Sequence, residues 1–143
     1  DTLRLEMKYN LYGNDMDEKC NPFEAGLSWI TKLEKGNFIG RDAIIDAKAK
    51  GLSKRLVSFT LEDRGFPRHG YKVLKGDKEI GYVTSGTFSP MLEKGIGLAY
   101  ITTDLTKPGD TFEVLVRDVP MKAVIVKPPF WKEGSARIQH VKQ

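Results

Sequence analysis

Residues 79–101, EIGYVTSGTFSPMLEKGIGLAYI, decide the fold of this chain. In residues 80–84, β-branched and aromatic side chains alternate with their neighbours, a pattern typical of a β-strand. Residues 85–90 gather glycine, serine and proline, and this composition predicts a turn. Residues 95–101 resume an apolar run, and the glycines in it indicate close approach of another backbone or a barrel corner. We therefore place a strand–turn–strand unit at the centre of a small β-barrel.

Further strand-like segments flank this unit on both sides. They fall at residues 56–61, 71–74, 111–116 and 121–127, and the glycine-containing loop at residues 75–78 predicts a hairpin. Six strands at this spacing, separated by turn residues, predict a mainly β fold. The residue pattern alone leaves both a barrel and a sandwich open.

The first third of the chain has a different character. Residues 2–8 favour a short helix by propensity, and residues 43–50 predict a second helix that stops at a glycine. Between them, residues 27–33 alternate as a strand does. We place a boundary near residues 51–53. It divides the chain into a short α/β linking segment, residues 1–53, and a barrel domain with a basic tail, residues 54–143.

Composition bounds the class of protein. The chain has 143 residues, of which 40% are hydrophobic and 29% charged, values typical of one soluble globular domain. No apolar run approaches the roughly 20 residues that span a bilayer. The single cysteine, Cys20, rules out an internal disulfide and favours a reducing compartment. The net charge of +4 permits anionic partners but is far from a nucleic-acid-binding footprint. Since the chain lacks an initiator methionine, we expect it to be a piece of a longer protein.

Three charged segments are candidates for a site. The acidic loop at residues 15–18 is better explained as solvated than as a metal or acid–base site, because no other ligand type lies at metal spacing nearby. Arg68, beside Arg64 and His69, is suited to a bidentate carboxylate contact or to a structural role in a turn. The basic tail carries Lys132 and Arg137, which either close over an anionic ligand or belong to a frayed terminus.

Signatures of a self-contained active site are absent from the sequence. There is no phosphate-binding P-loop, no dinucleotide fingerprint, no zinc-ligand spacing and no nucleophile motif with a histidine partner. Residue chemistry alone therefore predicts a barrel module with no catalytic residue and no metal site.

Several long motifs nevertheless resemble one family, the aminomethyltransferase or T-protein of the glycine cleavage system. They are DTLRLE (1–6), LYGNDMDE (11–18), NPFEAGLSW (21–29), FIGRD (38–42), LEDRGFPRHGY (61–71), GYVTSGTFSP (81–90) and KPPF (127–130). The motifs occur in order along essentially the whole chain. They resemble only the C-terminal portion of the family's chain, so residues 1–53 correspond to the end of the upstream folate-binding region and its linker.

The resemblance implies an activity for the longer protein. Such enzymes take the aminomethyl group carried on the lipoyl arm of H-protein, release ammonia and pass the one-carbon unit to tetrahydrofolate. The family's catalytic aspartate belongs to the portion upstream of this chain, so the fragment alone is expected to be inactive. The implied location is the bacterial cytoplasm or, in a eukaryote, the mitochondrial matrix, and the cytoplasm is preferred. Neither nucleic acid nor a membrane is an implied partner.

The same resemblance implies a fold and a set of folate contacts. The fold is a six-stranded Greek-key-like barrel from about residue 54 to residue 130. Tyr9 resembles a tyrosine of the folate pocket, and Arg137, with Lys132 as a substitute, resembles a basic residue that meets the glutamyl carboxylates of folate. Arg68 is the third-ranked candidate.

Because the upstream domain that residues 1–53 would complete is missing, we also expect Leu11, Phe23 and Trp29 to pack on the barrel or against a neighbouring copy.

Two other functions stay open at this point. One is the folate-handling end of a dimethylglycine or sarcosine oxidising enzyme, which shares this architecture. The other is a non-enzymatic barrel that binds nucleic acid, for which aromatic side chains should interleave with basic ones on one sheet face. Phe59, Tyr82 and Phe112 fall in strands without a clear basic stripe, so the sequence favours the aminomethyltransferase hypothesis.

Overall fold

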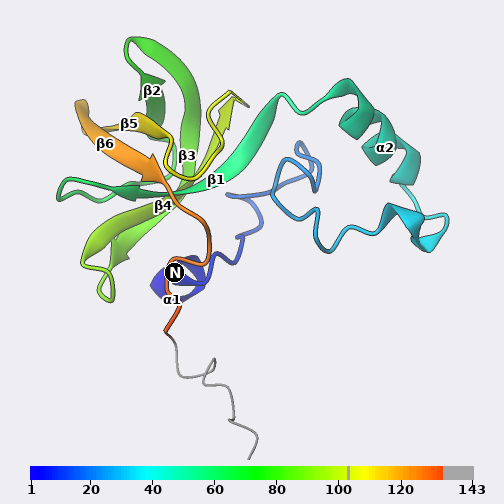
Figure 1. Cartoon of the computed structure of the whole chain (residues 1–143), viewed down its shortest axis with the longest axis horizontal. Helices are drawn as coiled ribbons and strands as arrows, with labels where there is room; N and C mark the ends of the chain where they lie inside the picture. Colours follow the sequence, from blue (N-terminus) through cyan, green and yellow to red (C-terminus); the bar gives the residue numbers. More distant parts are fainter. Residues whose placement is uncertain (103, 134–143) are drawn as a thin grey trace, which may run out of the picture.

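The computed structural model describes residues 1–102 and 104–133. Six antiparallel strands close into a barrel in the spatial order β1-β4-β3-β2-β5-β6 (Figure 1). β1 lies between β4 and β6 rather than beside β2, so the chain crosses the barrel between its first two strands. The prediction of a mainly β, six-stranded barrel is confirmed. The strands are β1 (Lys54–Leu61), β2 (Lys72–Lys75), β3 (Lys78–Ser89), β4 (Lys94–Thr102), β5 (Thr111–Val116) and β6 (Val119–Ile125).

The barrel interior is filled by the apolar members of the alternating patterns. In β5, Phe112, Val114 and Val116 are buried while the residues between them are half-buried. Phe112 packs edge-on against Phe59 of β1, with ring centroids 5.4 Å apart. Because side chains of a strand point alternately to its two faces, the period-two pattern places one apolar face of each strand in the core.

β3 differs from the prediction in its second half. The strand continues to Ser89 and the chain turns at residues 90–93, so the turn predicted at residues 85–90 is wrong. A Cβ atom on Gly86 would lie 2.3 Å from the carbonyl oxygen of Pro67. The glycine therefore admits a neighbouring backbone against the strand and does not bend the chain.

A second apolar cluster lies on the outside of the barrel, beneath α1 (Thr2–Glu6). Leu5 of this helix is fully buried against Leu56 and Leu98 of the barrel and Phe130 beyond β6. The Trp131 N–H donates to the Glu6 carbonyl at 3.1 Å, so the chain that leaves β6 runs beside α1 (Figure 1). This cluster docks the start of residues 1–53, hereafter the arm, on the barrel.

The rest of the arm leads away from the barrel. It contains a 3₁₀ turn, η1 (Leu33–Lys35), and α2 (Arg41–Lys50), which has no buried residue and stands apart from the strands in Figure 1. The strand predicted at residues 27–33 is wrong. A closed barrel offers no free edge for it to pair with, and the N–H groups of Ile30 and Thr31 donate instead to the Leu27 carbonyl.

Large apolar side chains of the arm face solvent. Trp29 is 72% exposed and Leu11 is 40% exposed, so the prediction that they pack on the barrel is wrong. Phe23 is half-buried, with the Lys48 ammonium 5.2 Å from its ring centroid. Packing against a neighbouring copy stays a prediction. In the part of the chain that the structure describes, no helix combines the length and the apolar character that crossing a bilayer requires.

Candidate functional site

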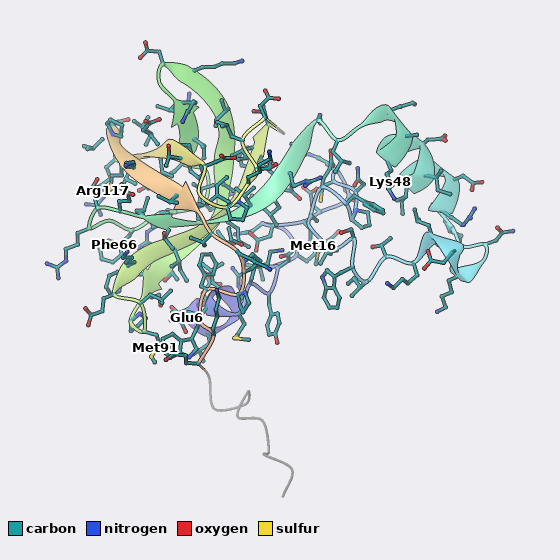
Figure 2. All side chains as sticks on the ribbon, in the orientation of Figure 1. Glu6, Met16, Lys48, Phe66, Met91 and Arg117 are labelled. Carbon is teal, nitrogen blue, oxygen red and sulfur yellow. The ribbon has the colours of Figure 1, made fainter. Side chains whose placement is uncertain are left out.

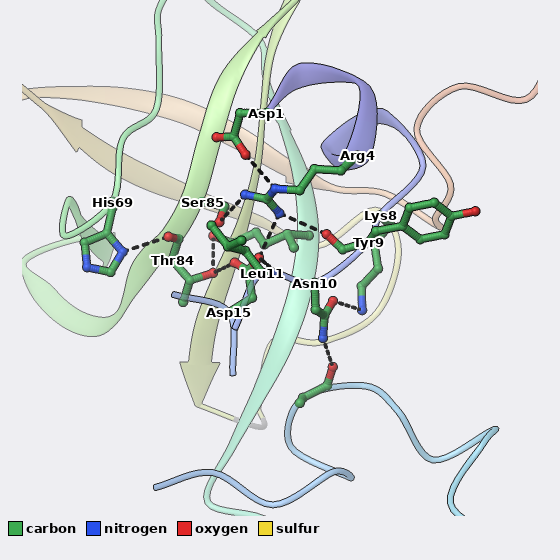
Figure 3. A network of polar contacts seen from close by, with 12 residues as sticks. Asp1, Arg4, Lys8, Tyr9, Asn10, Leu11, Asp15, His69, Thr84 and Ser85 are labelled. Atoms are coloured by element: carbon green, nitrogen blue, oxygen red, sulfur yellow. Dashed lines mark hydrogen bonds and ion pairs between the residues drawn. The ribbon is translucent and has the colours of Figure 1, made fainter. Parts of the chain in front are cut away.

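A buried ion pair between Arg4 of α1 and Asp15 lies where the arm meets the barrel (Figure 3). Arg4 Nη1 donates to Asp15 Oδ2 at 3.0 Å, and Arg4 Nη2 donates to the Ser85 hydroxyl of β3 at 3.1 Å. Asp15 is fully buried, so the prediction that its loop is solvated is wrong for this residue. The error has a physical reason, since a buried carboxylate is tolerated when charged and polar groups of other elements reach it.

The Leu11 N–H of the arm also donates to Asp15 Oδ2, at 2.8 Å, and β3 and β4 supply further partners. The Thr84 hydroxyl donates to Asp15 Oδ1 at 2.6 Å, and the Tyr100 hydroxyl donates to the Asp15 carbonyl at 3.0 Å. Thr84 lies where the β3–β4 register shifts, and His69 Nδ1 is 2.7 Å from its carbonyl oxygen. His69 thus holds its loop to β3, which is a structural role.

Tyr100 makes this joint sensitive to high pH. Burial, and then a hydrogen bond with the Cys20 thiol, raise the pKa of the Tyr100 phenol above its usual value. A raised folded-state pKa contributes stability below the unfolded value of about 10 that is lost as pH rises toward the folded value. We expect the free energy of unfolding of the native chain, relative to Tyr100→Phe, to fall as pH rises above about 10. Urea unfolding at a series of pH values measures this difference, and a difference independent of pH would contradict the assignment.

Immediately after α1 the chain turns sharply and presents Tyr9. The Lys8 N–H donates to the Leu5 carbonyl and the Tyr9 N–H to the Arg4 carbonyl, both at 2.8 Å. Lys8 has a φ of 59°, the left-handed conformation that ends many helices in this Schellman pattern. As a result the Tyr9 ring points away from the Arg4–Asp15 pair, as Figure 3 shows, and is 64% exposed.

A pocket with a volume of about 460 Å³ opens beside Tyr9, hereafter the Tyr9 pocket. Trp29 and Leu27 of the arm and the Pro128–Pro129 segment line its other sides. Lys8 reaches into it, donating to Asn10 Oδ1 at 3.0 Å, and burial lowers the pKa of its ammonium group. The arrangement offers two exposed aromatic faces and one partly desolvated cation, which suits a flat ring system carrying hydrogen-bond acceptors.

The other candidate residues lie elsewhere. Arg68 lines a pocket of about 320 Å³ with Phe66 and Arg117, on the side of the barrel remote from α2 (Figure 2). Lys132 lines a third pocket, of about 630 Å³, that meets the Tyr9 pocket only at Pro129. Arg137 lies outside the described residues. The structure therefore does not bring Arg68, Lys132 and Tyr9 into one pocket, and the folate contacts expected of them stay predictions.

The barrel matches a known protein family. Residues 54–132 match the glycine cleavage T-protein C-terminal barrel domain. The match spans all six strands and the segment that follows β6, more than half of the chain. This chain belongs to the glycine cleavage T-protein family. The resemblance seen in the sequence motifs is thereby confirmed.

Members of the T-protein family with curated names extend the similarity into the arm. The chain is 48% identical over 130 residues to an aminomethyltransferase of Halothermothrix orenii, a match that covers 91% of this chain and 36% of the relative. It is 51% identical over 134 residues to an aminomethyltransferase of Phocaeicola vulgatus, covering 92% of this chain and 37% of the relative. The chain thus spans a little over a third of the length of these relatives.

A solved structure in the T-protein family shows the same arrangement of elements. The glycine cleavage system aminomethyltransferase T of Bartonella henselae superimposes with a TM-score of 0.85 at 29% sequence identity. The match covers 92% of this chain and 37% of the Bartonella chain. Because it covers more of the chain than the barrel alone, arm residues are included in the shared fold.

Sequence reasoning missed two residues of the Tyr9 pocket. Trp29 was interpreted only as apolar packing surface, and Lys8 only as part of a helix. Their proximity arises from the fold. The turn after α1, residues 26–29 and the segment that follows β6 all line the same pocket. The one available signal was the motif at residues 21–29, which reaches Trp29 but does not say what lies beside it.

Proposed function

We propose that this chain is the C-terminal part of an aminomethyltransferase of the glycine cleavage system. The complete enzyme transfers the one-carbon unit of the aminomethyl group on lipoylated H-protein to tetrahydrofolate and releases ammonia. The single observation that carries the proposal is the identity of about half of all positions, over more than nine tenths of this chain, with relatives named aminomethyltransferase. Because those relatives are bacterial, we propose the bacterial cytoplasm as its location.

Within that enzyme, the Tyr9 pocket forms one wall of the tetrahydrofolate site. Tyr9 and Trp29 offer aromatic faces to the flat rings of the folate, and Lys8 offers a donor to its ring oxygen or carboxylates. With Tyr9 64% and Trp29 72% exposed, the wall has no opposite side within the described residues. The opposite side is then supplied by the length of the relatives that this chain does not span.

This division of the site explains the kind of catalysis expected. Transfer to folate requires its N5 atom to lie close to the methylene carbon, and holding the two in contact converts an encounter into a nearly unimolecular step. The side chains of this chain bind and orient the folate, and none of them is proposed to move a proton. Catalytic groups are assigned to the remainder of the enzyme.

The two alternative functions have less support. A nucleic-acid reader would stack bases on Phe59, Tyr82 and Phe112, yet Phe59 and Phe112 are fully buried in the barrel and, of the three, Tyr82 alone is exposed, at 41%. The relatives matched at about half identity are named aminomethyltransferases, rather than dimethylglycine or sarcosine oxidising enzymes.

Substitution in the Tyr9 pocket tests the proposed folate wall. In a protein that joins this chain to the upstream two thirds of an aminomethyltransferase relative, we expect Trp29→Ala to raise the Kd for tetrahydrofolate about tenfold, and Tyr9→Ala by roughly three- to tenfold, from lost ring contacts. Isothermal titration calorimetry measures both values.

The matched control is Tyr12→Ala. Tyr12 lies in the same arm and is 69% exposed, but it does not line the Tyr9 pocket, so its removal should leave the Kd unchanged. If Tyr12→Ala weakened binding as much as Tyr9→Ala, or if neither pocket substitution mattered, the folate would lie elsewhere.

A further inference from the structure

The pocket that contains Lys132 differs in character from the Tyr9 pocket. It has a volume of about 630 Å³ and lies between the outside of the barrel and the segment that follows β6. Ile125 and Phe130, which are 3% and 8% exposed, form its floor, together with half-buried Val126. A volume of this size is within the range of small-molecule sites.

Positive charge gathers at the rim of this pocket. Lys94 at the start of β4, Lys127 and Lys132 line it, and among the residues that the structure describes no aspartate or glutamate does. Across residues 1–102 and 104–133, none of these three ammonium groups forms an ion pair with a carboxylate. Other lysines of the barrel are neutralised in this way, as Lys72 is by Glu79 and Lys122 by Glu62.

An apolar floor beneath three unpaired cations favours a ligand that has an apolar part and a negatively charged group. Covering the floor with hydrocarbon contributes about 25 cal/mol of binding free energy per Å² of apolar surface removed from water. A negatively charged group on the ligand is attracted to the lysines of the rim, because each ammonium group is a compact point charge with three hydrogen-bond donors. Thr60 and the backbone are the other polar features of the lining, so a long polar ligand finds few partners.

We propose that this pocket, hereafter the lysine-rimmed pocket, binds an amphipathic monocarboxylate: an apolar body with one terminal carboxylate, such as a medium-chain fatty acid in free form. The inference goes beyond the proposed function, because neither one-carbon transfer nor H-protein requires such a ligand. The concave shape favours a free molecule over a membrane surface. The lining has one aromatic side chain, Phe130, which is buried, and this disfavours a nucleic acid that would stack bases along it.

Sodium octanoate is the probe that tests the lysine-rimmed pocket. In ¹H–¹⁵N correlation spectra of the labelled chain, octanoate should produce saturable shifts centred on Thr60, Val126 and Lys127, with a Kd on the order of 1 mM at low ionic strength. The uncharged analogue 1-octanol can cover the apolar floor but has no charge to interact with the lysines, so it should bind about tenfold more weakly.

A triple variant and a charge-matched control separate a site from general attraction to a basic protein. Replacing Lys94, Lys127 and Lys132 by Gln should raise the octanoate Kd about tenfold, because each exposed ion contact contributes about 0.2–1 kcal/mol. The control replaces Lys19, Lys35 and Lys78, all exposed and outside this pocket, by Gln and removes the same total charge. It should leave the Kd within about twofold of the native value.

Each contrary result overturns the proposal. Absence of saturable shifts, equal affinity for octanol, or an equal loss in the control triple would show that the lysine rim does not select a carboxylate. Tighter binding of anionic vesicles or of a single-stranded oligonucleotide than of octanoate, lost in the same triple variant, would assign the surface to a membrane or a nucleic acid instead. None of these outcomes bears on the folate wall, since the Tyr9 and Trp29 variants are read out with a different ligand in a different pocket.

Discussion

Asp15→Ala is expected to lower the free energy of unfolding by about 3–5 kcal/mol, because it removes the buried carboxylate of the Arg4–Asp15 ion pair together with the hydrogen bonds that this carboxylate accepts. Asp15 is fully buried and its two carboxylate oxygens accept three hydrogen bonds, from Arg4 Nη1, the Leu11 N–H and the Thr84 hydroxyl. Alanine cannot accept any of them. The Arg4 guanidinium, whose side chain is only 18% exposed, would then lose its buried counter-charge and keep the more exposed carboxylate of Asp1.

Urea unfolding followed by circular dichroism measures this effect, and Glu18→Ala is the matched control. Glu18 belongs to the same acidic loop but is exposed, so its removal should change the free energy of unfolding by less than about 0.5 kcal/mol. A loss below about 1 kcal/mol for Asp15→Ala would mean that the contacts of the Asp15 carboxylate do not hold the arm to the barrel.

Phe59→Ala is the second change with a large expected effect, a loss of about 3–5 kcal/mol in the free energy of unfolding. The ring is fully buried, packs edge-on with Phe112, and occupies space that Gly97 of the neighbouring strand leaves free. A Cβ atom on Gly97 would lie 2.5 Å from the Phe59 ring. Removing the ring therefore leaves a cavity in a part of the core shaped around it.

Phe66→Ala controls for the loss of an aromatic ring as such. Phe66 is 52% exposed and also makes an edge contact, with Phe88 at a centroid distance of 5.5 Å. We expect it to cost less than about 1.5 kcal/mol in the same urea experiment. Equal losses in the two variants would place the barrel core elsewhere than around Phe59.

The barrel was predictable in part because some of its strands follow a local period-two rule. In β5 the apolar residues occupy every second position, and the structure buries those positions. The loop at residues 75–78 likewise joins β2 to β3 as the hairpin signal predicts. Closure of the sheet was not accessible in this way, since it depends on pairing between β1 and β6, at opposite ends of the barrel sequence.

The sequence-based predictions are wrong where a residue pattern typical of one local structure occurs in another. Gly86 looks like a turn residue but makes room for Pro67, and the alternation around Trp29 has no strand to pair with. Asp15 looks solvated because one partner of its carboxylate, Thr84, lies 69 residues further along the chain. For Gly86 and Asp15 a contact between segments remote in sequence overrides the local pattern, whereas the segment around Trp29 lacks the strand partner that its pattern needs.

The candidate site was predictable only in part for the same reason. The family resemblance gave Tyr9, but Trp29 joins it only after the arm folds back beside the chain leaving β6. The exposure of both rings within one pocket is a property of the three-dimensional arrangement. It is also the reason to regard this pocket as half of a site.

Calorimetric titration of tetrahydrofolate tests that claim most directly. The titration is performed on this chain alone, on the upstream two thirds of an aminomethyltransferase relative alone, and on the two together. We predict that measurable binding appears only in the mixture and is lost there in Trp29→Ala. Tight binding by this chain alone, or binding by the upstream part that the addition of this chain does not change, would contradict a folate site shared between the two.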